Sequence, residues 1–487
     1  MKRSPWHLCA QILLLFLFLV NLYRAATQSI TTDEAFTYNR SVSVPIPALW
    51  RNFDANDHVL HTLLCKVTTN LFGVSEFTLR MPALAGGVLY FWTVLALCRT
   101  LFRDGPFFLL AVASLTLNPM MLDYCSIARG YGMATALLLF ALYHLIRFQE
   151  SIRELWRMNV AGFALALGVA ANLTVAMPGT VLVLAFAVWY LGGALHDQTR
   201  LSARFDHLAN RMIIPGIVVL VTIVLVPMLP AKREHFYVGS TEFMHFLTSL
   251  VYACLWRPAN LLETMPINRI VENALRIAGE FALPVLTLAL IGLAAARRRM
   301  TVAHWWLTAT VLLTAGLQVI LHQWLGLLYP ERRTGLYYVP LATLTALAAA
   351  HVAPRILRIG AGVVACTAIL MFLLSWNVRY YDEWLFDAGT RDLMRQVQRQ
   401  YAGSGKKRIT ASWPLLHVVG FYRNLYGLHW LEVPQPNERP VQGMDLYLLT
   451  PEDQPLIDQW KLRILTENSV SRVRLANRLT GETSANP

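Results

Sequence analysis

Charged side chains are scarce in this chain of 487 residues. Asp, Glu, Lys and Arg together account for 15% of it, whereas residues with hydrophobic side chains account for 56%. A water-soluble globular protein needs a larger polar share to cover its surface. The shortage of charge therefore argues against an ordinary soluble enzyme and indicates a polytopic α-helical membrane protein.

Acids are the scarcer kind of charge, since 29 Asp and Glu against 42 Lys and Arg leave a formal net charge of +13. In a membrane protein, surplus Lys and Arg serve first to hold loops on the cytoplasmic side, so we expect no nucleic-acid partner. The six cysteines show no CxxC spacing and lie mostly in apolar runs. This pattern argues against a disulfide framework and a cysteine zinc site.

Apolar runs of membrane-spanning length recur along the chain, and we count about eleven of them when shorter runs are included. They centre near residues 17, 92, 114, 139, 165, 184, 220, 288, 312, 343 and 368. Arginines collect in alternate connecting segments: Arg99 and Arg103; Arg147, Arg153 and Arg157; Arg200, Arg204 and Arg211; Arg297, Arg298 and Arg299; Arg355 and Arg358. The positive-inside rule then predicts a cytoplasmic N-terminus and an external C-terminus.

The first apolar run allows a second interpretation. The stretch "KRSPWHLCAQILLLFLFLVNLYRAATQS" has the basic start, apolar centre and small residues of a cleavable signal peptide. Under either interpretation the residues that follow it lie on the outer face of the membrane.

Three outward segments are long: about 27–82, about 230–280, and the tail from residue 377. In the tail, the apolar pieces "RITAS" and "DLYLLT" flank a helical "PLLHVVGFYRNLYG", which predicts a small extracytoplasmic α/β domain. We therefore expect a transmembrane domain over 1–376 and a soluble domain over 377–487. In the second segment, "STEFMHFLTSLVYACLWRP" has helical periodicity and fits an interfacial helix or a lid.

Two charged motifs stand on the outer side. Asp33 and Glu34 follow the first span directly, and they fit either catalytic carboxylates or the first turn of a helix capped by a threonine. Arg332 and Arg333 lie in an outward turn, against the positive-inside rule. Their most economical partner is a phosphate group, which a guanidinium binds through paired hydrogen bonds.

The order of motifs in the first 150 residues resembles the GT-C superfamily of membrane glycosyltransferases, in particular its protein-O-mannosyltransferase-like bacterial branch. The chain reads "TTDEAFTYNR", then "ANDHVLHTLL", "LFGVSEFTLRMPALAGG" and "LDYCSIARGYGM". The matching positions are Asp33, Glu34, His58, Gly73, Ser75, Glu76, Arg80, Pro82, Gly86, Tyr124, Ser126, Arg129 and Tyr131. "YPERRTGLYYVPL" resembles the family's lipid-phosphate segment more weakly. The chain lacks the two prolines that follow the family's histidine, and Ala128 stands where an acid is common, with Asp123 upstream.

The resemblance implies an enzyme that moves a sugar from a polyprenyl-phosphate donor to an acceptor hydroxyl. This GT-C-like enzyme would lie in the bacterial inner (plasma) membrane with its active site facing the periplasm. Asp33 and Glu34 are its catalytic candidates, and Arg129, Arg332 and Arg333 are the candidates for binding the donor phosphate. The candidates for contact with substrate or metal are His58, Asp123 and Tyr131. The resemblance leaves open whether the enzyme uses a divalent cation as a cofactor. No glycine-rich phosphate loop for a nucleotide sugar is present.

The chemistry of these groups fits the implied reaction. An acceptor hydroxyl needs a base, which a carboxylate supplies, whereas a departing lipid phosphate needs positive charge. Attack on the face opposite the phosphate would invert the anomeric carbon. Other classes stay open: a lipid-linked glycan ligase or polymerase, a transporter or flippase of lipid-linked sugars, and a structural assembly subunit. The sequence names neither the sugar nor the acceptor, which is a glycan, a lipid or a protein.

Overall fold

The computed structural model describes residues 4–49, 54, 58–195, 198–229, 231–232, 238–255, 266–434 and 439–478. The chain divides into two compact units. The first comprises Met1–Leu22, Trp50–His61 and Pro82–Trp376, and the second comprises Tyr23–Leu49, Thr62–Met81 and Asn377–Pro487. Helices α1, α4 and α5 contribute residues to both.

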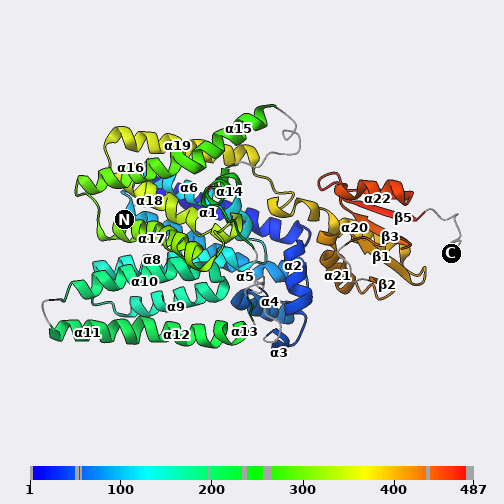
Figure 1. Ribbon diagram of the computed structural model, residues 1–487, viewed down its shortest axis with the longest axis horizontal. Helices are drawn as coiled ribbons and strands as arrows, with labels where there is room; N and C mark the ends of the chain where they lie inside the picture. Colours follow the sequence, from blue (N-terminus) through cyan, green and yellow to red (C-terminus); the bar gives the residue numbers. More distant parts are fainter. Residues whose placement is uncertain are drawn as a thin grey trace. The chain divides into compact units, whose positions relative to one another are not determined.

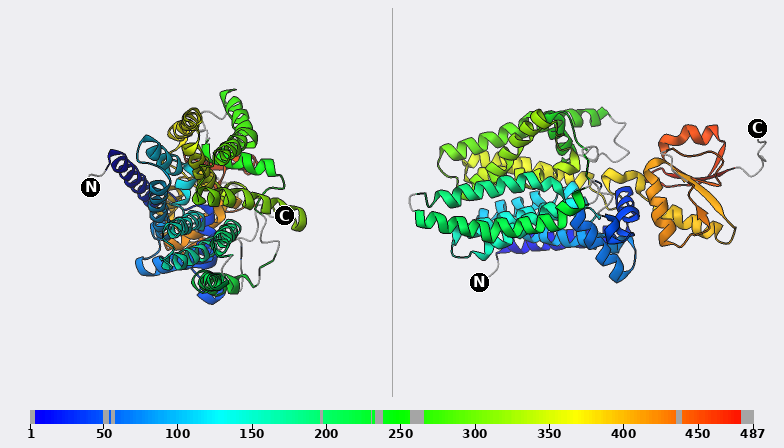
Figure 2. Two further views of the ribbon diagram at one scale, coloured as in Figure 1. Left: turned by 90° about the vertical axis from the view of Figure 1, so that its left-hand side faces the viewer. Right: turned by 60° about the horizontal axis from the view of Figure 1, so that its bottom comes forward.

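The first unit is a helical bundle, whose helices run side by side in Figures 1 and 2. Its helices are α1 (Pro5–Thr27), α5 (Glu76–Leu101), α6 (Pro106–Thr116), α7 (Pro119–Tyr124), α8 (Gly130–Glu150), α9 (Trp156–Ala171), α10 (Ala176–Gly192), α11 (Gln198–Leu208), α12 (Ile214–Leu220), α13 (Val226–Met228), α14 (Phe243–Leu255), α15 (Pro266–Ile277), α16 (Leu283–Ala296), α17 (Val302–Leu325), α18 (Tyr338–Val352) and α19 (Arg355–Ser375). Short π-helical turns η3 (Ala209–Ile213), η4 (Val221–Leu225) and η6 (Ala278–Ala282) join some of them, and η2 (Leu173–Val175) and η7 (Arg332–Gly335) are 3₁₀ turns.

Every predicted span centre falls inside one of these helices. Among the described residues, eight helices are long and apolar enough to cross a membrane. The centres near residues 114, 165 and 343 fall in the shorter helices α6, α9 and α18. The membrane-protein class is therefore confirmed, and a total of about eleven crossings stays a prediction. The fourth short apolar helix, α14, lies within the stretch "STEFMHFLTSLVYACLWRP", whose last three residues are outside the described residues. Its role as an interfacial helix or a lid stays a prediction.

Small residues allow the helices of the bundle to approach one another closely. Helix α8 is buried along most of its length and packs against α9. A Cβ atom on Gly162 of α9 would lie 2.6 Å from the carbonyl oxygen of Met212. Where lipid replaces water, this close packing is a main source of helix association, because apolar side chains gain little from leaving lipid.

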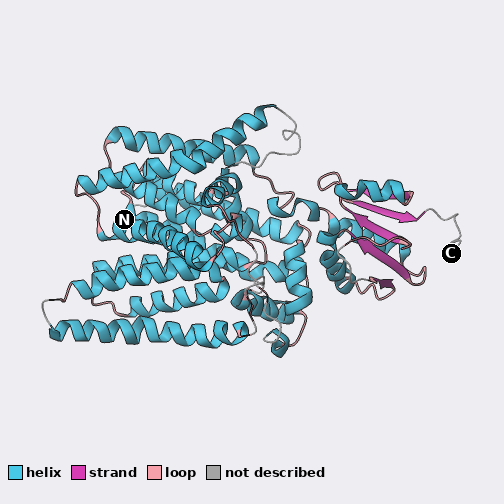
Figure 3. Ribbon diagram, viewed as in Figure 1, coloured by secondary structure: helices cyan, strands magenta, loops and turns pink. Residues whose placement is uncertain are grey.

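The second unit contains a mixed five-stranded sheet, which holds all the described strands (Figure 3). The strands are β1 (Lys407–Ala411), β2 (Leu431–Glu432), β3 (Leu446–Leu449), β4 (Leu462–Glu467) and β5 (Arg474–Arg478), in the order β2-β1-β3-β5-β4. Strand β1 is parallel to β2 and β3, and β5 is antiparallel to β3 and β4. All four residues of β3 are buried, as expected for an apolar run inside a covered sheet. The predicted small α/β domain is confirmed.

Helices α20 (Thr390–Tyr401), α21 (Leu416–Leu425) and α22 (Gln454–Gln459) accompany this sheet, with 3₁₀ turns η8 (Asp382–Asp387), η9 (Trp413–Leu415) and η10 (Pro451–Asp453). The first outer loop belongs to the same unit through α2 (Thr32–Thr37), η1 (Tyr38–Val42), α3 (Ile46–Leu49) and the end of α4 (Val59–Phe72). Helix α2 packs on α21, and so does η1, where the ring of Tyr38 lies 5.1 Å from that of Phe421, edge to face. The acid pair therefore belongs to a compact unit that also contains the C-terminal segment.

Candidate functional site

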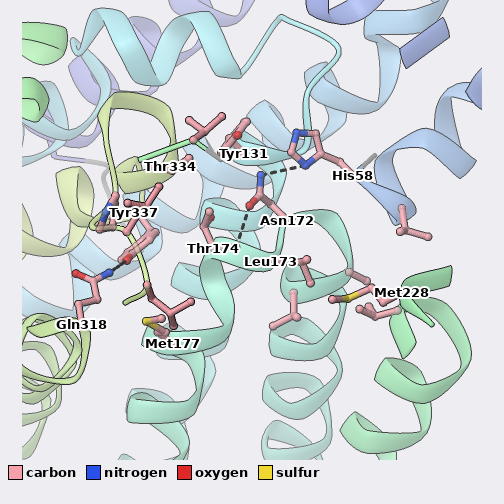
Figure 4. Close-up of a pocket in the computed structure, with 18 of the residues that line it drawn as sticks. His58, Tyr131, Asn172, Leu173, Thr174, Met177, Met228, Gln318, Thr334 and Tyr337 are labelled. Atoms are coloured by element: carbon pink, nitrogen blue, oxygen red, sulfur yellow. Dashed lines mark hydrogen bonds between the residues drawn. The ribbon is translucent and has the colours of Figure 1, made fainter. Parts of the chain in front are cut away.

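A cavity of about 270 Å³ lies in the first unit, between the helices of the bundle (Figure 4). One part of its lining is apolar: Val59, Val169, Ala170, Leu173, Met177, Val224, Met228, Val238, Leu327, Leu328 and Pro330. The other part is polar: His58, Tyr131, Asn172, Thr174, Gln318, Tyr329, Thr334 and Tyr337. A cavity lined by both apolar and polar side chains accommodates a ligand that has both a hydrocarbon part and a polar part.

His58 is held in place at the polar part of the cavity. Its Nδ1 atom lies 3.1 Å from Nδ2 of Asn172, and Asn172 Oδ1 accepts a hydrogen bond of 2.9 Å from the backbone N–H of Thr174. The imidazole ring also packs edge to face on Tyr131, with ring centroids 4.8 Å apart. Of the three predicted substrate or metal residues, His58 and Tyr131 therefore meet at the cavity.

Two predicted phosphate-binding arginines act electrostatically on His58. Burial lowers the pKa of His58 well below its ordinary value, and the charges of Arg129, His61 and Arg333 lower it further. Burial, followed by the charge of Arg129, lowers the pKa of His61 to about 3. Arg129 is fully buried and stands in extended conformation directly before α8. Two arginines from distant segments of the chain therefore lie within electrostatic range of His58.

Arg332 and Asp123 are placed differently. The side chain of Arg332 is exposed, and its backbone has a φ of 42°. Its backbone N–H donates to Ser249 Oγ of α14 at 3.2 Å, so the residue helps to anchor the turn η7. Asp123 is buried in α7 and, like Arg129 and Arg333, is not among the residues that line the cavity. Their predicted roles in binding phosphate and in contact with substrate or metal stay predictions.

Two glycines in the "ARGYGM" motif explain how the chain at Arg129 and Tyr131 comes close to His58. A Cβ atom on Gly130 would lie 1.9 Å from the carbonyl oxygen of Ala171 and 2.9 Å from Cβ of His58. A Cβ atom on Gly132 would lie 2.2 Å from the carbonyl oxygen of Tyr124. Glycine is the residue that permits such a close approach of backbone to backbone.

The sequence did not single out Asn172 or Gln318. Gln318 of α17 donates from Nε2 to the hydroxyl oxygen of Tyr337 at 2.6 Å and accepts from the Tyr338 hydroxyl at 2.9 Å. Each amide is one polar residue in a mainly apolar helix region, which is the only signal that the sequence offers. Polar residues within membrane segments often mark a functional cavity.

The acid pair belongs to the second unit, where α2 begins with a capping box. The Thr31 hydroxyl accepts from the backbone N–H of Glu34, and Glu34 Oε2 accepts from the backbone N–H of Thr31 at 2.8 Å. Glu34 also forms a bidentate pair with Arg80, at 2.8 Å and 2.7 Å. Both side chains are completely buried. The interpretation of the pair as a helix start therefore describes the local structure correctly.

Asp33 is the half-buried member of the pair. Burial raises the pKa of Asp387 well above its ordinary value, and the negative charges of Asp33 and Glu34 raise it further, whereas hydrogen bonds from Thr32 act in the opposite direction. Burial lowers the pKa of His417, which the charge of Asp33 opposes. Asp33 therefore lies within electrostatic range of both groups. The catalytic roles of Asp33 and Glu34 stay predictions.

The "FGVSEF" motif has a structural explanation in the second unit. Gly73 has a φ of 81°, and Ser75 Oγ accepts a backbone N–H in the first turn of α5. Glu76 forms an ion pair of 2.6 Å with Arg391 and accepts from the Tyr422 hydroxyl at 3.0 Å. The motif thus ties the start of α5 to the C-terminal segment. Across the described ranges, no group of three or more His, Cys, Asp or Glu side chains is arranged to hold a metal ion.

Known proteins resemble this chain in fold rather than in sequence. No protein-family model and no curated protein sequence matches the chain. The crystal structure of ArnT from Cupriavidus metallidurans bound to undecaprenyl phosphate superposes with a TM-score of 0.52, at 14% identity, over 99% of both chains. The apo oligosaccharyltransferase of Archaeoglobus fulgidus gives a TM-score of 0.48 at 12% identity, over 86% of this chain and 64% of that one.

The likeness to ArnT covers the helical bundle and the C-terminal sheet together. At this low identity it shows the fold and leaves the activity open. Placement in the protein-O-mannosyltransferase-like branch stays a prediction. The chain is a polytopic α-helical membrane protein with a GT-C-like fold and a small C-terminal α/β domain.

Proposed function

We propose that this protein is a membrane glycosyltransferase that moves a sugar from a polyprenyl-phosphate donor to an acceptor hydroxyl on the periplasmic face of the bacterial inner membrane. The ArnT structure of the same fold was crystallised with undecaprenyl phosphate, which is a donor of this kind without its sugar. That likeness supports the fold, and the two arginines whose charges act on His58, a residue of the cavity lining, support the ligand.

One observation carries the proposal. Arg129 and Arg333 come from segments about 200 residues apart, and both of their charges act on His58, which lines the cavity. Convergent guanidinium groups bind phosphate oxygens through charge-assisted hydrogen bonds, each of which is worth about 1.5–3 kcal/mol. The apolar part of the same lining suits the first isoprene units of the lipid. A phosphate on a hydrocarbon chain matches both parts.

The proposed reaction is a single displacement at the anomeric carbon. The acceptor oxygen forms a bond to that carbon while the bond from carbon to phosphate oxygen breaks, so the configuration inverts. The acceptor proton passes to a carboxylate, and the phosphate leaves with both bond electrons on the lipid. We assign the base to Asp33 rather than Glu34, because both oxygens of Glu34 accept hydrogen bonds from Arg80.

Neighbouring arginines provide a matched test of phosphate binding. We expect Arg333→Ala and Arg129→Ala to weaken binding of undecaprenyl phosphate by roughly ten- to a hundredfold, the cost of one charge-assisted contact. Arg332→Ala is the control, because its exposed side chain should change the affinity by less than about threefold. Affinity is measured on protein in nanodiscs. Equal affinities for all four proteins would place the phosphate elsewhere.

The base is tested separately from the binding site. Asp33→Asn keeps the shape of the side chain but removes its basicity, so transfer should fall about 10²–10⁴-fold while binding of undecaprenyl phosphate is retained. Envelope glycans, glycolipids and proteins from cells with and without the enzyme identify the acceptor by mass spectrometry. A variant that keeps more than about a tenth of the wild-type turnover would contradict the role of Asp33.

A further inference from the structure

Asn172 occupies an unusual position at the cavity. It is 4% exposed and caps η2, at the point where α9 ends and the chain turns toward α10. One side of its amide meets a backbone N–H, and the other side meets His58 (Figure 4). No motif in the sequence accounts for an amide here.

The backbone determines which way the amide faces. Because the Thr174 N–H is a donor, the atom of Asn172 that contacts it at 2.9 Å must be the oxygen. The nitrogen therefore faces His58 and donates to Nδ1 at 3.1 Å. A ring nitrogen that accepts a hydrogen bond carries no proton, so the proton of the neutral imidazole is on Nε2.

The surroundings of His58 keep the ring neutral and in place. The charged and titratable groups that act on it are Arg129, His61 and Arg333, and all of them oppose a positive charge on the imidazole. A Cβ atom on Gly130 would lie 2.9 Å from Cβ of His58, so the backbone of Gly130 packs closely beside this residue.

The Nε2–H group is then a donor in need of an acceptor. His58 is 6% exposed and lines the cavity, and its Nε2 atom is buried without a hydrogen-bond partner among the residues that the structure describes. Buried donors of this kind nearly always meet a partner, which is a protein group, water or a ligand. Other atoms of His58 line the cavity, so a ligand oxygen there reaches Nε2 after a small shift of the groups that cover it.

We propose that Asn172 is a positioning residue that keeps the proton of His58 on Nε2, so that His58 donates a hydrogen bond to an oxygen of the lipid phosphate. The inference rests on the proposed function, because it takes that phosphate as the ligand. A neutral donor adds a directional contact beside Arg129 and Arg333 without a further positive charge. Release of the lipid phosphate product would then break fewer ionic contacts than if His58 were positively charged.

The substitution Asn172→Asp tests this role directly. A carboxylate at this position accepts from Nδ1–H, so it draws the proton of His58 from Nε2 to Nδ1 and favours the protonated ring. At about pH 8 the Nε2 lone pair of the variant would face the phosphate, and binding of undecaprenyl phosphate should be roughly tenfold weaker than in the wild type. At about pH 6 the protonated ring donates again, so the ratio of the two affinities should return toward one.

Controls separate this effect from other causes. The affinity ratio of variant to wild type at each pH removes the titration of the phosphate itself. The exposed Asn424 of α21 offers the matched substitution Asn424→Asp, for which the ratio should not depend on pH. In a His58→Gln background, Asn172→Asp should lose its pH-dependent effect, because Asn172 acts through His58.

Nitrogen NMR of ¹⁵N-histidine-labelled protein gives a readout that needs no ligand. The His58 signals, assigned with His58→Gln, should report an Nε2–H tautomer in the wild type and an Nδ1–H tautomer or imidazolium in Asn172→Asp. An Nδ1–H tautomer in the wild type would overturn the inference, as would a pH-independent affinity ratio. Failure of the wild type to bind undecaprenyl phosphate would instead remove the proposed function, and the inference with it.

Discussion

The ion pair between Glu34 and Arg80 leads to a prediction about stability. Arg80 has five N–H donors, and the structure assigns an acceptor to every one. Nε and Nη2 donate to Glu34, Nη2 also to the carbonyl of Ser29, and Nη1 to those of Gln28 and Ala25. Glu34→Gln keeps the shape of the acid but leaves the buried guanidinium without its counter-charge.

The expected cost follows from the burial of both side chains. Removal of one partner from a fully buried pair typically costs about 3–5 kcal/mol. Because about 1.4 kcal/mol corresponds to a factor of ten, the opening of this region should become roughly 10²–10⁴-fold more frequent. Hydrogen exchange of peptides that cover residues 25–37, measured by mass spectrometry in nanodiscs, reports that change. Peptides from the helical bundle should not show an increase of this size in their hydrogen exchange.

Two further variants are compared with Glu34→Gln. The exposed pair of Lys406 and Glu432, at 3.0 Å, is the control, since Glu432→Gln should cost less than about 1 kcal/mol. The double replacement Arg80→Met with Glu34→Leu should recover only part of the loss, because three backbone carbonyls lose their donors. If Glu34→Gln exchanged hydrogen like the wild type while turnover was lost, the role of Glu34 would be chemical and our reasoning would be wrong.

Three further predictions concern other parts of the chain. Burial raises the folded-state pKa of Asp387 above its ordinary value of about 3.9, so stability should fall as the pH rises from about 4 through that pKa, and Asp387→Asn should flatten this fall in the melting midpoint. Gly130→Ala should lower both stability and phosphate binding because its Cβ would meet Ala171 and His58, whereas Gly292→Ala, with open space around it, should stabilise α16 by about 0.5–1 kcal/mol. Transfer should persist after exhaustive chelation, and a complete loss that added metal reverses would establish a divalent cofactor.

The sequence determined the membrane class and the presence of a small α/β domain, and it predicts that the motifs lie on the outer side. These features depend on composition and on local periodicity, which each segment carries by itself. The helix start at Asp33 and Glu34 is equally local, because a capping box involves residues that are three positions apart.

Only the tertiary structure decided which distant residues meet. It separates Glu34, whose oxygens bind Arg80, from the half-buried Asp33, although the two acids are adjacent in the chain. It also distinguishes Arg333, whose charge reaches His58, from the exposed Arg332. The contact between Asn172 and His58 joins residues 114 positions apart. Such pairs depend on helix packing, which no local pattern encodes, and so the amide beside the histidine could not be read from the sequence.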